Sequence, residues 1–85
     1  MLLDALLGKW RSTHSGAPVT IERSGDTYVV TITEAGQTGS GPATYGDGIM
    51  TVKWGMMDAT IYYEASADRL VYNLMGSDEF VRVSR

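Results

Sequence analysis

The chain contains no cysteine and only one histidine among its 85 residues. Without cysteine, neither a disulfide framework nor a thiolate metal site can form. A metal site made from other ligands needs several clustered His, Asp or Glu side chains, and a single histidine cannot anchor one. We therefore expect no metal and no cofactor.

Positive charge is scarce as well. Seven Lys and Arg residues against ten Asp and Glu give a net charge of −3, and the basic residues are scattered along the chain. Binding to nucleic-acid phosphates usually needs a basic patch. The first seven residues are too short for a signal peptide or a membrane span, and Asp4 stands where a signal carries Lys or Arg. We therefore expect neither nucleic acid nor a membrane as a partner.

Catalytic motifs are also missing. Gly39-Ser40-Gly41 precedes a predicted strand, whereas a nucleophile elbow lies between a strand and a helix. The turn Gly46-Asp47-Gly48 lacks the further acidic ligands of a calcium loop. The glutamates fall on different predicted strands, so no carboxylate pair shares one face. We predict that the protein is not an enzyme.

What the chain does contain is a succession of short segments with alternating apolar residues, separated by glycine and small polar residues. Pro42 makes one of these segments the weakest strand, and residues 34–41 before it are expected to form the longest loop. The predicted strands cover approximately 9–14, 19–23, 27–33, 42–45, 50–54, 59–63, 70–74 and 79–83.

Connections this short permit only antiparallel neighbours, because parallel strands need long crossovers. Such a meander can stay open, fold into a sandwich or close into a barrel. Closure is favoured because it removes both exposed edges. We predict a single all-β domain over residues 1–85, an eight-stranded antiparallel up-and-down β-barrel.

A leucine-rich lead-in precedes the first strand. Leucines at positions 2, 3, 6 and 7 share one face of two helical turns, and Gly8 can end such a turn. Trp10 is then the first large apolar residue of the opening strand. This order predicts a short N-terminal helix that plugs the base of the barrel.

Both ends of the chain resemble the calycin superfamily, which comprises the lipocalin, fatty-acid-binding and avidin barrels. Gly8-Lys9-Trp10 is similar to the Gly-x-Trp signature that opens the first strand of that superfamily, and Phe80-Val81-Arg82-Val83 looks like the final avidin strand. The resemblance implies a small bacterial-type lipocalin-like or avidin-like domain in which Arg82 covers Trp10 and closes the base. A planar guanidinium stacks well on an indole. Biotin binding is not implied, since Trp54 is the only other tryptophan.

The alternation directs many large apolar side chains inward, and a barrel of eight strands has room for little more than its own side chains or one small ligand. One interpretation is therefore a filled core without a cavity. The other is a shallow ligand site at the open mouth, where the ends of the odd-numbered strands converge. We expect its contacts from His14, Trp54, Ser12 and Glu34. His14 is also compatible with a rim position, hydrogen-bonded to a loop.

The outer face carries a second candidate. Tyr62, Val71, Val81 and Val83 point outward by parity on neighbouring strands, so they are expected to form one apolar patch. Such a patch suits a homodimer. Alternatively, β-branched residues merely favour strands, or the N-terminal leucines fold over them.

These observations lead to two hypotheses. The first is a non-catalytic barrel that binds a small apolar or aromatic molecule at the open mouth. The second is an interaction or structural domain with a filled barrel, which acts through its outer face, as a monomer or as a homodimer.

Overall fold

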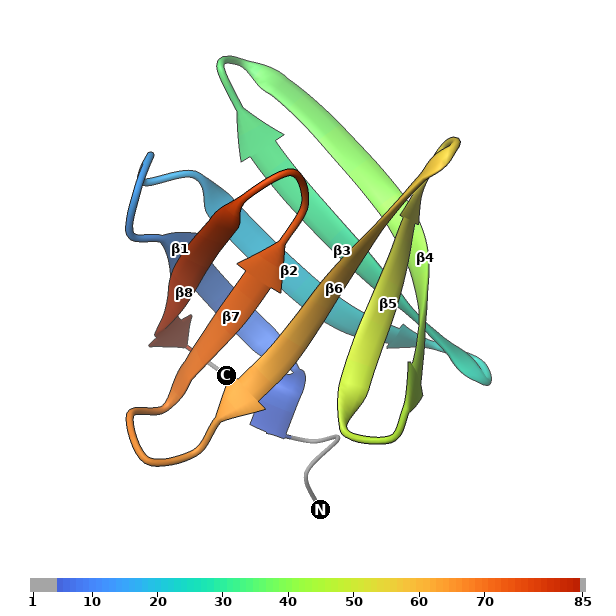
Figure 1. The fold of residues 1–85 in the computed structure, drawn as a ribbon. Helices are drawn as coiled ribbons and strands as arrows, with labels where there is room; N and C mark the ends of the chain where they lie inside the picture. Colours follow the sequence, from blue (N-terminus) through green and yellow to red (C-terminus); the bar gives the residue numbers. More distant parts are fainter. Residues whose placement is uncertain (1–4, 85) are drawn as a thin grey trace.

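The computed structural model describes residues 5–84 and shows a closed barrel of antiparallel strands, in which each strand pairs with the next and the last returns to the first (Figure 1). The strands are β1 (Gly8–Ser12), β2 (Pro18–Ser24), β3 (Thr27–Glu34), β4 (Gln37–Gly46), β5 (Ile49–Trp54), β6 (Met57–Glu64), β7 (Arg69–Asn73) and β8 (Ser77–Ser84). The predicted all-β class, strand number and up-and-down connection are confirmed.

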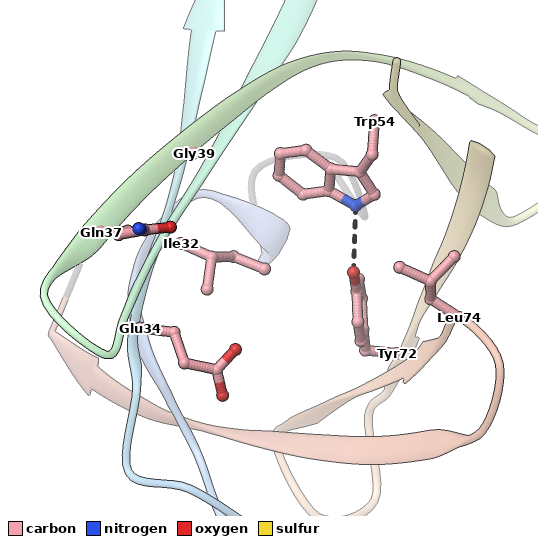
Figure 2. Close-up of a pocket in the computed structure, with 7 residues that line it drawn as sticks. All are labelled: Ile32, Glu34, Gln37, Gly39, Trp54, Tyr72 and Leu74. Atoms are coloured by element: carbon pink, nitrogen blue, oxygen red, sulfur yellow. Dashed lines mark hydrogen bonds between the residues drawn. The ribbon is translucent and has the colours of Figure 1, made fainter. Parts of the chain in front are cut away.

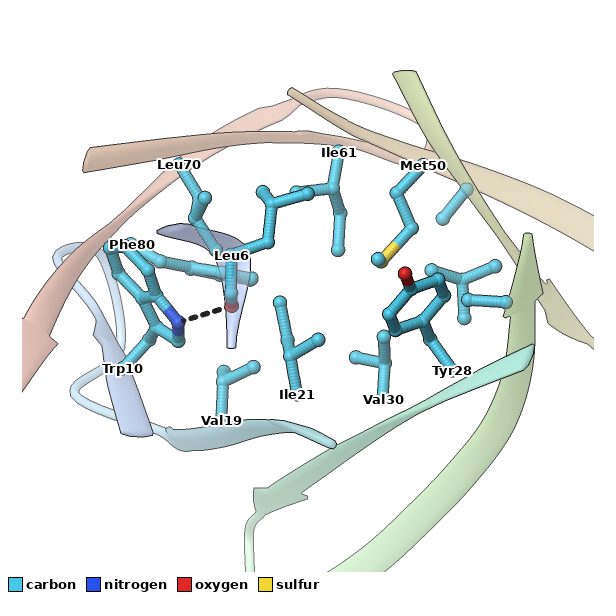
Figure 3. Packing of buried hydrophobic residues seen from close by; sticks show 13 residues of the cluster. Leu6, Trp10, Val19, Ile21, Tyr28, Val30, Met50, Ile61, Leu70 and Phe80 are labelled. Carbon is cyan, nitrogen blue, oxygen red and sulfur yellow. Dashed lines mark hydrogen bonds between the residues drawn. The ribbon is translucent and has the colours of Figure 1, made fainter. Parts of the chain in front are cut away.

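The core follows from strand alternation. Met50 and Val52 on β5 are fully buried, whereas Lys53 between Val52 and Trp54 is exposed. The buried side chains meet inside the barrel (Figure 3): Leu6, Trp10, Val19, Ile21, Tyr28, Val30, Ala43, Met50, Val52, Ala59, Ile61, Leu70 and Phe80. The middle of the barrel is therefore filled by side chains.

The predicted helical plug is not seen as an element. Residues 1–4 lie outside the described residues, and helical backbone in the described part is limited to Ala5 and Leu6. Leu6 nevertheless sits at 1% exposure in the core cluster, so the end of the lead-in does pack against the barrel. No helix within residues 5–84 has the length and hydrophobicity to cross a bilayer.

The expected long loop over residues 34–41 is wrong. β3 continues to Glu34, Ala35 and Gly36 form the turn with φ of 54° and 78°, and the longest strand begins at Gln37. Positive φ at both central residues is what a type I′ hairpin turn requires. The serines and threonines of this stretch serve as cross-strand partners, because Thr31 and Ser40 hydroxyls lie 3.0 Å apart and Thr33 and Thr38 likewise.

The first strand also ends earlier than predicted. β1 stops at Ser12, and residues 13–15 form a turn in which the Gly16 N–H donates to the Ser12 carbonyl at 3.0 Å. The Ser12 hydroxyl accepts the N–H groups of His14 and Ser15 at 3.2 and 3.1 Å. This local hydroxyl–backbone bonding competes with the strand ladder and ends it.

One part of the barrel wall separates at its upper end. β4 pairs with β3 from Gln37 to Ala43 and with β5 only from Ala43 to Gly46. The β3–β4 hairpin accordingly leans away from β5 and β6 (Figure 1). Pro42 lies just beyond the β4–β5 pairing, an edge position that tolerates a residue without an N–H.

Candidate functional site at the open mouth

The two ends of the barrel differ, and the base is closed. The Arg82 guanidinium carbon lies 4.2 Å from the centre of the Trp10 ring, and the Trp10 indole N–H donates to the Leu6 carbonyl at 3.0 Å. Arg82 also donates to the carbonyls of Ala5 and Leu7 at 2.6 and 3.3 Å. Its Nε contacts Asp68 at 3.0 Å. Arg82 therefore ties together the last strand, the lead-in and the turn before β7.

The other end holds a cavity of about 290 Å³ (Figure 2). It opens where the β1–β2, β3–β4, β5–β6 and β7–β8 connections converge. Its lining comes from the ends of β3, β4, β5 and β7: Ile32, Glu34, Gln37, Gly39, Trp54, Tyr72 and Leu74. A deeper hollow of about 180 Å³ shares Glu34 and Tyr72 with it and reaches Ser12 and Asp78. Together these hollows form the mouth site.

Glycine on the inner face of β4 shapes this site. A Cβ at Gly41 would meet the Lys53 carbonyl at 2.4 Å and the Trp54 ring at 3.0 Å, so only glycine lets the indole lie against β4. A Cβ at Gly39, two residues nearer the mouth, would meet nothing within 4 Å. The wall therefore supports Trp54 at one position and leaves open space at the next.

Two aromatic side chains, Trp54 and Tyr72, line the mouth beside β4. The Trp54 indole N–H donates to the Tyr72 hydroxyl at 3.0 Å, and the Tyr72 ring stacks on Phe80 with centroids 5.1 Å apart. Phe80 belongs to the buried core. The Trp54–Tyr72 hydrogen bond and the Tyr72–Phe80 stack thus connect the mouth aromatics to the buried core.

Burial and nearby negative charges affect the pKa of the Tyr72 hydroxyl. Burial raises the pKa of Tyr72 above its ordinary value, and the negative charges of Glu34 and Asp78 raise it further. The hydrogen bond from Trp54 opposes these effects. Both carboxylates therefore act electrostatically on the aromatic wall.

The two carboxylates differ in how they are held. Asp78 accepts the Ser12 hydroxyl at 2.5 Å and the backbone N–H of Glu79 at 2.7 Å, which fixes its orientation. Glu34 accepts no hydrogen bond from any residue that the structure describes, and its carboxylate projects into the cavity (Figure 2). Glu34 is thus available to a ligand, and Asp78 supplies fixed charge below it.

The structure brings three of the four predicted mouth residues to the site and leaves one outside. Trp54, Glu34 and Ser12 line the cavity or the deeper hollow. His14 lies at the same end, but its side chain is exposed in the turn after β1 and lines neither hollow. Only its backbone N–H contributes, through Ser12.

Sequence reasoning missed part of the site. Ile32 and Tyr72 are each among the last inward residues of their strands and so reach the mouth. Asp78 directly precedes the predicted last strand over residues 79–83. Its position two residues before Phe80 is the signal that could have identified it as inward-facing.

The four residues of the predicted outer patch do lie on the outer wall of β6, β7 and β8. Cross-strand pairing sets Tyr62 beside Val71. Val83 is 56% exposed and Tyr62 43%, but Val71 is only 8% exposed. Val81 is half-buried.

Charged side chains separate the members of this patch. Arg69 faces Val81 across the β7–β8 pairing and forms ion pairs with Glu64 and Glu79. Val83 instead lines a separate outer hollow of about 240 Å³ with Pro18 and Thr20. The patch is therefore divided, and the homodimer stays a prediction.

The geometry defines a filled antiparallel barrel with a closed base and an aromatic, acidic mouth. Within residues 5–84, no group of three His, Asp or Glu side chains is arranged to hold a metal ion. Comparisons with protein-family models, curated proteins and solved structures found no match to this chain.

Proposed function

We propose that the protein is a non-catalytic binding barrel that takes one small aromatic or apolar molecule at its open mouth. The observation that carries the proposal is the cavity of about 290 Å³ in front of Trp54 and Tyr72, at the one end of the barrel that the core does not fill. Ligand pockets in proteins combine apolar or aromatic walls with a few placed polar groups. The mouth has this composition.

The shape of the wall supports the same conclusion. Gly39 leaves a position on the inner face of β4 without a side chain, two residues nearer the mouth than Gly41, on which the indole of Trp54 lies. A flat ring can occupy such a slot and contact the indole face at little entropic cost, because Trp54 is already held by Tyr72.

The chain-end motifs fit a calycin-type ligand carrier. In this proposal the barrel is lipocalin-like or avidin-like, with Trp10 and Arg82 closing the base beneath the site. Within residues 5–84, closure of the base leaves the mouth as the entrance along the barrel axis.

The test uses two glycines of β4. Gly39→Leu places a side chain in the mouth, whereas Gly46→Leu is the matched control, because a Cβ at either position meets nothing within 4 Å and Gly46 lies at the opposite end of the strand. The probe is N-phenyl-1-naphthylamine, a neutral dye that fluoresces in apolar sites. We expect the unmodified protein and Gly46→Leu to bind one dye molecule and Gly39→Leu to bind none.

Native mass spectrometry of the same three proteins gives a second readout, a copurified small molecule that Gly39→Leu lacks. Equal dye binding by all three proteins, or no binding by any of them, would overturn the proposed function.

A further inference from the structure

We infer that the mouth site selects a small aromatic amine: a flat ring that carries a protonated ammonium group. This inference rests on the proposed function and adds the charge of the ligand to it. Its basis is the position of Glu34 and Asp78 in an aromatic cavity that no basic side chain of the described residues lines.

Glu34 is the direct partner for the ammonium group. Its carboxylate projects into the cavity between Ile32 and Tyr72 (Figure 2) and accepts no hydrogen bond within residues 5–84. A charge-assisted hydrogen bond from an ammonium group would supply the missing donor. Glu34 is otherwise exposed to solvent.

Asp78 adds negative charge that no cationic side chain of the described residues neutralises. Its two oxygens accept only neutral donors in the described structure, the Ser12 hydroxyl and the Glu79 N–H. The raised pKa of Tyr72 has Glu34 and Asp78 among its causes, so the negative potential of both groups extends to the aromatic wall.

Among the described residues, the basic side chains lie outside the lining of the mouth. Lys53 lies 3.6 Å from Asp58 on the outer wall, and Arg69 is paired on the outside of β7. Arg82 closes the base. An anionic ligand at the mouth would therefore meet two carboxylates with no compensating charge, a juxtaposition that binding sites use to reject wrong partners.

The aromatic walls favour the same ligand. Trp54 and Tyr72 border the cavity together with Glu34. A cation over the face of an indole or phenol ring is attracted by the ring quadrupole. The ring of the ligand would occupy the open slot at Gly39, and its ammonium group would lie toward Glu34.

The experiment compares three probes of nearly equal size and different charge: 2-phenylethylamine, 2-phenylethanol and 3-phenylpropanoate. Amide chemical shifts of the uniformly ¹⁵N-labelled protein report both affinity and location. We expect the amine to bind roughly fivefold more tightly than the alcohol, about the effect of one exposed ion pair. The acid should bind more weakly than the alcohol. Shifts should be confined to the mouth.

Glu34→Gln tests the partner, and Glu22→Gln on the exposed part of β2 is the matched control. We expect Glu34→Gln to remove most of the amine preference, with Asp78 and the aromatic rings retaining the remainder, and to leave the affinity for the alcohol unchanged. Glu22→Gln should change neither affinity.

Equal binding of amine and alcohol, or an amine preference that is undiminished in Glu34→Gln, would overturn the inference. Binding of the neutral dye reports separately on the proposed function, which stands if the dye binds and the amine shows no preference. The amine could also cause shifts outside the mouth that Glu22→Gln and Glu34→Gln reduce to the same extent. That result would indicate general attraction to an acidic protein and would also overturn the inference.

Discussion

The two ends of this barrel each hold a tryptophan, and they use it in opposite ways. Trp10 at the base is 1% exposed and its ring is covered by Arg82, whereas Trp54 at the mouth is half-buried and borders a cavity. Both indole N–H groups donate a hydrogen bond, Trp10 to a carbonyl and Trp54 to Tyr72. The comparison shows that satisfying the polar atom is common to both roles. What separates the two positions is whether the ring face is covered by another side chain or borders a cavity.

Neighbouring segments cause the difference. At the base, the lead-in contributes Leu6 to the core and the carbonyls of Ala5 and Leu7 to Arg82. At the mouth, β4 parts from β5 beyond Ala43 and presents glycine to the interior. The predictions below test this contrast.

The largest effect is expected at the base. Trp10→Ala removes a fully buried ring and should lower the free energy of unfolding by about 3–5 kcal/mol, the usual range for a buried aromatic residue. Trp54→Ala, at the half-buried mouth position, should lower it clearly less. Urea denaturation followed by far-UV circular dichroism measures both. Equal losses would remove the distinction between a closing and a binding tryptophan.

The second effect concerns the glycines that shape the mouth. Gly41→Ala places a Cβ against the Lys53 carbonyl and the Trp54 ring, so it should destabilise the protein by about 1–3 kcal/mol and shift Trp54 fluorescence. Gly39 lies on the same face of the same strand, where a Cβ has free space. Gly39→Ala should therefore change the free energy of unfolding by no more than about 0.5 kcal/mol. The same denaturation measurement applies. A silent Gly41→Ala would contradict the close packing of Trp54 on β4.

Much of the fold could be predicted because turn signals and alternation recur along the whole chain. The boundaries of β4 could not, since its first half is rich in glycine, serine and threonine, a composition typical of loops. Pairing with β3 makes that half a strand: the hydroxyls of Ser40 and Thr38 bond across to β3, and this long-range partner is invisible in a local pattern.

The mouth was predicted in outline for a similar reason. Parity and hairpin order place Trp54 and Glu34 at one end, and the structure has them there. His14 was wrongly expected in the site because the predicted first strand was two residues too long. The turn formed by the Ser12 hydroxyl ends the alternation at Ser12. The slot at Gly39 depends on where β4 and β5 part, which is a matter of register and not of composition.

The smallest expected effect concerns the pKa values of one tyrosine at each end of the barrel. The pKa of Tyr72 at the mouth and that of Tyr63 near the base are both raised, but burial is the first cause for Tyr72 and the hydrogen bond to Asp68 for Tyr63. Glu34→Gln should therefore lower the pKa of Tyr72 alone, and Asp68→Asn that of Tyr63 alone. Titration of the ¹³Cζ resonances measures both.

The same shift predicts how stability responds to alkali. A tyrosine whose pKa is raised on folding ionises first in the unfolded chain, so its stabilising contribution is complete below the ordinary value of 10.0 and is lost as the pH rises through the folded pKa. Tyr72→Phe should therefore flatten the decline of unfolding free energy above pH 10.0. Trp54→Phe should steepen it, because the indole N–H that lowers the pKa of Tyr72 is gone. Identical slopes in Trp54→Phe and the unmodified protein would show that the Trp54–Tyr72 hydrogen bond does not hold the mouth in solution.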